Sequence, residues 1–149
     1  MGYIPANAKW YLAEIVQQIS VEDDPRIVVH ANVVLIRADS PDDAYEKAVL
    51  LGAGKQTSYE NPHGKRVTFT FRGLRDLNVI HDELEHGAEL SYTEFTDMDE
   101  AAIQHYISPR EELGVFTAIE SPGGPNYASK EVIDKLLEKF PGLDLGEGW

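Results

Sequence analysis

The chain has 149 residues and a formal net charge of −13, from 13 Lys or Arg against 26 Asp or Glu. This charge argues against nucleic acid and anionic membranes as partners, because both are bound through Lys and Arg, and it favours a basic protein. The absence of cysteine excludes disulfides, thiolate zinc sites and cysteine nucleophiles.

Two strands are expected in the first quarter of the chain. Residues 9–19 alternate, with Tyr11, Ala13 and Ile15 on one face. After a turn, residues 26–37 carry the strongest strand pattern of the sequence. Both faces of this second strand are largely apolar, which indicates a strand in the middle of a sheet.

A helix and a hairpin are expected next. Ser40 is a good N-cap and Pro41 suits the first helical position, so a helix should begin here and end at a glycine about a dozen residues later. Residues 55–60 and 65–72 then form two arms joined by the turn residues 61–64, because Asn and Pro favour the start of a turn and Gly its end.

The second half of the chain predicts one further strand and two helices. Residues 89–95 alternate and are expected to form the strand. One helix should run from a capping pair, Thr96 and Asp99, to Ile107, and an amphipathic helix should follow Ser129.

These elements predict an α+β fold with a mainly antiparallel sheet of about five strands and helices packed on one face. We assign residues 1–120 to a single α+β domain. Residues 121–149 are expected to be a linker and a C-terminal amphipathic helix that packs on the same domain.

Aromatic, small and glycine residues form a recognisable pattern between Lys9 and Glu94. It comprises Trp10-Tyr11, Ala44, Ala48, Gly52, Tyr59, Asn61, Gly64, Phe71, Gly73-Leu74, Asp76-Leu77, Leu84, Gly87 and Glu89-Leu90. This pattern resembles the bacterial domain of unknown function DUF4288. The resemblance implies a compact bacterial protein and no particular activity. Because the sequence also has no signal-peptide pattern and no apolar run that could span a bilayer, we expect it in the cytoplasm.

One candidate ligand pocket lies on the second strand. His30 and Asn32 interrupt its apolar pattern on the same face, and Glu14 and Tyr11 on the neighbouring strand could complete a small-molecule or acid–base site. The alternative is that these polar groups only satisfy each other in the core.

The stretch His81-Asp82-Glu83-Leu84-Glu85-His86 offers ligand types that suit zinc or manganese. The two histidines are five residues apart, however, so they share a face of neither a helix nor a strand. We therefore assign no metal and no cofactor, and the alternative is a solvated acidic turn.

Acidic residues dominate the sequence from residue 76 to residue 100, which holds nine Asp or Glu and no Lys or Arg. Internal pairing with Arg66 and Arg72 would account for part of this charge. Otherwise the stretch is an acidic interaction face. The residues assigned to that face are Asp82, Glu83, Glu85, Glu89 and Glu94.

No catalytic signature is present, and we assign no catalytic residue. The leading hypothesis is a non-catalytic, acidic protein-interaction module that binds a basic protein or forms a homo-oligomer. One alternative is a small enzyme or a ligand- or metal-binding domain that uses His30 and Glu14, or the loop from His81 to His86. Another is a mimic of nucleic-acid charge.

Overall fold

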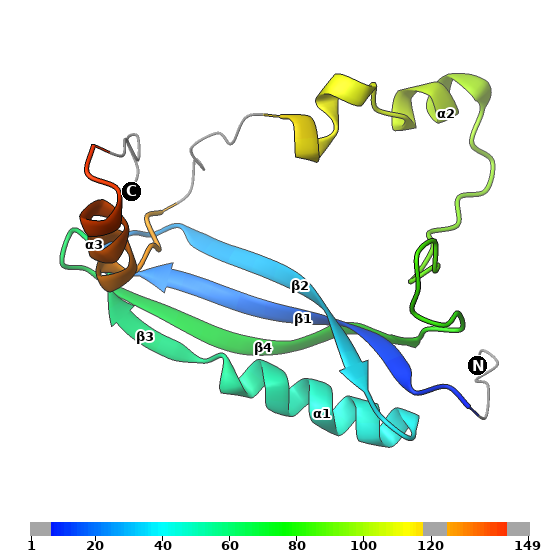
Figure 1. Cartoon of the computed structure of the whole chain (residues 1–149), viewed down its shortest axis with the longest axis horizontal. Helices are drawn as coiled ribbons and strands as arrows, with labels where there is room; N and C mark the ends of the chain where they lie inside the picture. The colour runs from blue at the N-terminus through cyan, green and yellow to red at the C-terminus, as the bar shows by residue number, and fades with distance from the viewer. Residues whose placement is uncertain (1–6, 118–124, 143–149) are drawn as a thin grey trace. The chain divides into compact units, whose positions relative to one another are not determined.

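The computed structural model describes residues 7–117 and 125–142, and it contains one antiparallel sheet with the strand order β2-β1-β4-β3 (Figure 1). The strands are β1 (Trp10–Val21), β2 (Ile27–Arg37), β3 (Thr57–Glu60) and β4 (Arg66–Val79). The helices are α1 (Pro41–Gly54), α2 (Glu100–Tyr106) and α3 (Lys130–Lys139), and two short 3-10 turns occupy Arg110–Glu112 and Gly114–Phe116. The α+β class is therefore confirmed, with four strands in the sheet instead of about five.

The chain divides into two compact units. The first, the sheet unit, takes in Met1–Ser91 and Pro122–Trp149, and the second takes in Tyr92–Ser121. The second unit is therefore an insertion between two parts of the first. The sheet, α1 and α3 all belong to the sheet unit, and α2 belongs to the insertion.

Strand β1 lies at the centre of the sheet, and its side chains are buried at every second position from Tyr11 to Val21. It pairs with β2 in one unbroken register from Trp10–Arg37 to Ser20–Ile27. Its pairing with β4 instead shifts register at two places, near Glu14 and near Val16. Such bulges bend and twist a strand.

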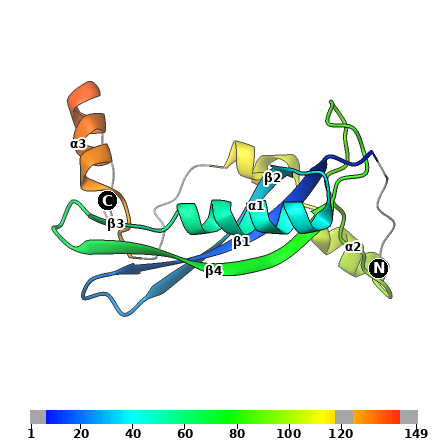
Figure 2. The same ribbon diagram turned by 90° about the horizontal axis from the view of Figure 1, so that it is seen from below.

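Helix α1 covers one face of the sheet, as Figure 2 shows from a second direction. The predicted cap is confirmed, because the Ser40 hydroxyl accepts a hydrogen bond of 3.1 Å from the Asp43 backbone N–H. The side of α1 that meets the sheet carries only small residues, namely Ala44, Ala48 and Gly52. They let the helix approach Tyr11 and its neighbours closely, and this contact forms the main core.

The predicted hairpin is also confirmed, since β3 and β4 are antiparallel and pair from Thr57–Phe69 to Glu60–Arg66. The buried side chain of Asn61 organises its turn. The Oδ1 atom of Asn61 accepts from the backbone N–H groups of His63 (3.0 Å) and Lys65 (2.9 Å). Its Nδ2 atom donates to the backbone carbonyl of Asn126 at 3.0 Å, which ties the C-terminal segment to the hairpin.

Two predictions about strands were wrong. Residues 89–95 form no strand, because their alternating pattern meets no partner strand and their side chains are all exposed. Strand β2 lies at an edge of the sheet instead of its middle. Its apolar pattern suggested a central strand with cover on at least one side, and the structure turns only one of its faces toward the core.

Candidate functional site

The first candidate surface is a stretch of chain that follows the last strand, and we call residues 81–117 the acidic segment. None of these residues is buried. The segment contains ten Asp or Glu and one basic residue of the Lys and Arg type, Arg110. Residues 81–91 of the segment belong to the sheet unit, and residues 92–117 belong to the insertion.

Large apolar side chains are interleaved with these carboxylates, and all of them are exposed. They are Leu84, Leu90, Tyr92, Phe95, Ile103, Tyr106, Ile107, Leu113, Val115 and Phe116. A few local contacts order the segment, including an edge-to-face pair between Phe95 and Tyr106 with ring centres 5.1 Å apart. The guanidinium of Arg110 also lies 4.2 Å from the ring centre of Phe116.

The carboxylates of the acidic segment form no ion pair with any Lys or Arg in the described part of the chain. The predicted internal partners are used elsewhere: Arg66 donates to the Ser58 hydroxyl (2.9 Å), and Arg72 donates to Gln18 (2.6 Å). Within the segment, Asp82 accepts a backbone hydrogen bond from Glu89 at 2.9 Å. Asp99 caps α2 without Thr96, accepting from Ala102 at 2.8 Å.

The second candidate surface is the face of the sheet opposite α1, which we call the open face. Its most exposed apolar side chains come from alternate positions of β2. Ile27, Val29, Val33 and Leu35 keep 61%, 60%, 58% and 46% of their surface accessible. The sequence shows apolar residues at these odd-numbered positions of β2, but it did not lead us to expect that they are exposed.

The residues of the predicted ligand pocket do not converge. Glu14 lies on the open face, where its carboxylate accepts a hydrogen bond from Arg75 at 2.5 Å and raises the pKa of that guanidinium. Tyr11, His30 and Asn32 lie on the opposite face, because they pair with or neighbour the buried positions of β1. Glu14 and His30 are therefore separated by the sheet.

On the face that bears α1, the polar side chains of β2 contact protein groups. The Nδ2 atom of Asn32 donates to Oε1 of Gln17 at 3.3 Å. The ring of His30 meets Tyr127 edge to face, with centres 5.7 Å apart. Tyr11 is buried in the main core. These contacts are those of polar groups packed in a core, and among the described residues the buried Nε2 atom of Gln17 has no hydrogen-bond partner.

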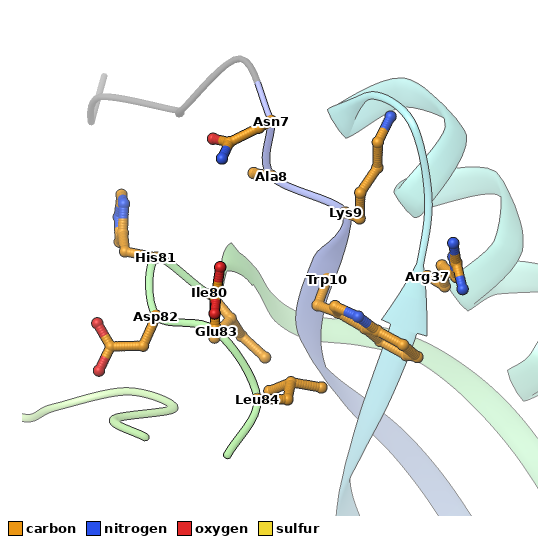
Figure 3. A pocket seen from close by; sticks show the side chains of 10 residues that line it. All are labelled: Asn7, Ala8, Lys9, Trp10, Arg37, Ile80, His81, Asp82, Glu83 and Leu84. Atoms are coloured by element: carbon orange, nitrogen blue, oxygen red, sulfur yellow. The ribbon is translucent and has the colours of Figure 1, made fainter. Parts of the chain in front are cut away.

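A pocket of about 330 Å³ lies at one end of the sheet (Figure 3). Its walls come from the start of β1, the end of β2 and the turn after β4. The turn contributes His81, Asp82 and Glu83, and the guanidinium of Arg37 lies 5.8 Å from the ring centre of Trp10. His86 does not line this pocket. Within the described residues, no three His, Asp or Glu side chains are grouped so that they could hold a metal ion.

Residues 10–92, more than half of the chain, match the family described as a domain of unknown function, DUF4288. Neither a curated protein nor a solved structure matches the chain. The matched residues cover the whole sheet and α1 and end where the insertion begins. Among the described residues, no helix is both long enough and apolar enough to cross a bilayer.

Proposed function

This chain belongs to the DUF4288 family, and on that premise we propose that it is a non-catalytic interaction module of the bacterial cytoplasm. In this proposal the acidic segment binds a protein whose surface is both basic and apolar.

One observation carries the proposal: the acidic segment has no buried residue although it is rich in large apolar side chains. A segment that buries so little of its own apolar surface gains little free energy from folding alone. Exposed apolar groups of this number are typical of surfaces that are covered by a partner. The carboxylates between them would select a partner of opposite charge and speed the encounter.

The alternatives fit the geometry less well. An acid–base site would need Glu14 and His30 together, and the sheet separates them. A mimic of nucleic acid would display carboxylates in place of phosphates, and the interleaved residues Tyr92 and Phe95 have no counterpart in a phosphate backbone.

The test compares two triple variants that remove the same charge from different places. The first replaces three Glu residues of the acidic segment by Gln, at Glu83, Glu85 and Glu94. The second, the matched control, replaces three exposed Glu residues outside the acidic segment by Gln, at Glu22, Glu46 and Glu138. The wild-type chain first captures a partner from a native lysate, and binding of that purified partner is then measured by calorimetry.

We expect the first variant to lose about 0.2–1 kcal/mol of binding free energy for each carboxylate removed, the range for exposed ion pairs. The control variant should bind as the wild type does. An equal loss of affinity in both variants would show that net charge, and not the acidic segment, governs binding. Hydrogen exchange that stays unprotected throughout residues 81–117 in the complex would contradict the proposal.

A further inference from the structure

Strand β2 is an edge strand without the features that usually protect one. It has 11 residues, pairs with β1 without a bulge, and contains no Pro, Lys, Asp or Glu between Ile27 and Ile36. Natural sheets blunt their edges with short strands, charges, prolines or bulges. At the opposite edge β3 has only four residues, and the part of β4 that extends beyond it carries Arg72, Arg75 and Asp76.

The direction of the backbone groups on β2 follows from its ladder with β1. The Ala38 N–H donates to the Lys9 carbonyl at 2.9 Å, so even-numbered residues of β2 point their N–H and C=O groups at β1. The odd-numbered residues point theirs away from the sheet. The outward-pointing set is Ile27, Val29, Ala31, Val33, Leu35 and Arg37.

The side chains of these same residues are symmetric about Ala31. Two copies of β2, antiparallel and centred on Ala31, would place Val29 opposite Val33 and Ile27 opposite Leu35. Every one of these pairs joins two residues whose backbone groups point outward, as a hydrogen-bonded ladder requires. On the other face, His30 would lie opposite Asn32 of the second copy, polar against polar.

We propose that β2 is the dimer interface of this protein: two copies pair antiparallel along it in the register centred on Ala31. The two sheets then continue into one of eight strands with both β2 strands in its middle. This arrangement accounts for the pattern of β2, which is that of a strand inside a sheet. It uses a surface separate from the acidic segment and does not depend on the proposed function.

Local charge permits this pairing although each chain is strongly acidic. No Asp or Glu occurs between Pro25 and Ala38. The nearest carboxylate on the N-terminal side, Asp24, is ion-paired with Arg26 at 2.7 Å. That contact lowers the pKa of Asp24 to about 2. The remaining carboxylates of the two chains interact across distances at which salt screens them.

The first experiment measures the mass of the full chain by light scattering over a range of concentrations. We expect the mass of two chains for the wild type and of one chain for Val33→Lys. The matched control is Thr70→Lys, which adds the same charge to the open face on β4, away from the edge, and should remain a dimer. Val33 and Thr70 are both exposed in the single chain, so we expect both variants to fold. Circular dichroism checks this.

Ala31→Pro separates pairing at the edge from packing of the two open faces. The Ala31 N–H points away from β1, so proline there removes no hydrogen bond of the single chain but breaks the centre of the proposed ladder. We expect this variant to be a monomer. A dimer that survives it would overturn edge pairing.

The register is tested with single cysteines, which is straightforward because the natural chain has none. Ala31→Cys places two sulfurs on directly opposite residues, whose Cα separation of roughly 5.5 Å suits a disulfide. In Val29→Cys the two sulfurs lie several residues apart along the strands. We expect a covalent dimer on mild oxidation from Ala31→Cys and not from Val29→Cys. A wild-type monomer at all concentrations, or the reverse cross-linking result, would overturn the proposal.

Discussion

Gly52 illustrates how a single residue fixes the distance between helix and sheet. It lies on the buried side of α1, facing the ring of Phe71 on β4. A side chain at this position would have no room, because a Cβ atom would lie 2.5 Å from Cδ1 and 3.0 Å from Cζ of that ring. Glycine is thus kept inside a helix despite its low helix propensity.

We expect Gly52→Ala to lower the free energy of unfolding by roughly 1–2 kcal/mol, since overpacking outweighs the gain in helix propensity. The control is Gly54→Ala in the same helix, where no atom lies within 4 Å of the added Cβ. That variant should gain about 0.4–1 kcal/mol, because alanine restricts the unfolded chain. Urea unfolding measures both, and a stabilising Gly52→Ala would mean that Phe71 moves aside freely.

At the scale of elements, the β3–β4 hairpin is joined to the C-terminal segment by side-chain contacts. Asn61 donates to the backbone carbonyl of Asn126, and the hydroxyl of Tyr59 donates to the backbone carbonyl of Tyr127. Burial raises the pKa of that phenol, which favours the protonated donor. These contacts place the segment that leads into α3 beside the second core cluster, around Ile19 and Val67.

Two substitutions of Asn61 separate its roles. Asn61→Ala removes all three side-chain hydrogen bonds and should cost about 2–4 kcal/mol of unfolding free energy, because the partly buried N–H groups of His63 and Lys65 lose their acceptor. Asn61→Asp keeps the acceptor of the turn but loses the donor to Asn126. The oxygen that replaces Nδ2 repels the Asn126 carbonyl, so hydrogen exchange should accelerate in α3 and stay unchanged in β3. Equal exchange rates in α3 for wild type and Asn61→Asp would exclude the contact as a tie.

The sequence predicted the elements whose pattern and neighbours are local. Strand β1, the cap at Ser40 and the β3–β4 hairpin follow from alternation, capping and turn residues close together in the chain. Position within the sheet could not be predicted in this way. Residues 89–95 alternate as a strand does but have no partner strand. The apolar row of β2 would look the same beside another strand of this chain or beside another molecule, so it does not show that β2 lies at an edge.

The candidate surfaces, too, could be predicted only in part from the sequence. The charge of the acidic segment is visible in the sequence, and the structure adds that its apolar residues are exposed too. The separation of Glu14 from His30 was not foreseen, because odd and even positions of paired strands fall on one face or the other according to the register.

For the whole molecule, the two proposed surfaces differ in their response to salt. Binding through the acidic segment should weaken as salt rises from roughly 0.05 to 0.5 M, because exposed charges are screened. The β2 dimer should persist or strengthen, because its interface lacks carboxylates and the two acidic bodies repel each other less. Light scattering and partner binding on the same salt series check this, and a parallel decline of both would mean that one surface serves both contacts.

The placement of the insertion within the sheet unit also affects how the protein would respond to cleavage. A protease that cuts the chain within residues 92–117 would produce two fragments that stay together. The hairpin still holds the C-terminal fragment through Asn61 and Tyr59. The nicked protein would run as one species until denatured. By the same reasoning, the insertion could be exchanged for another of different length while the sheet unit folds as before.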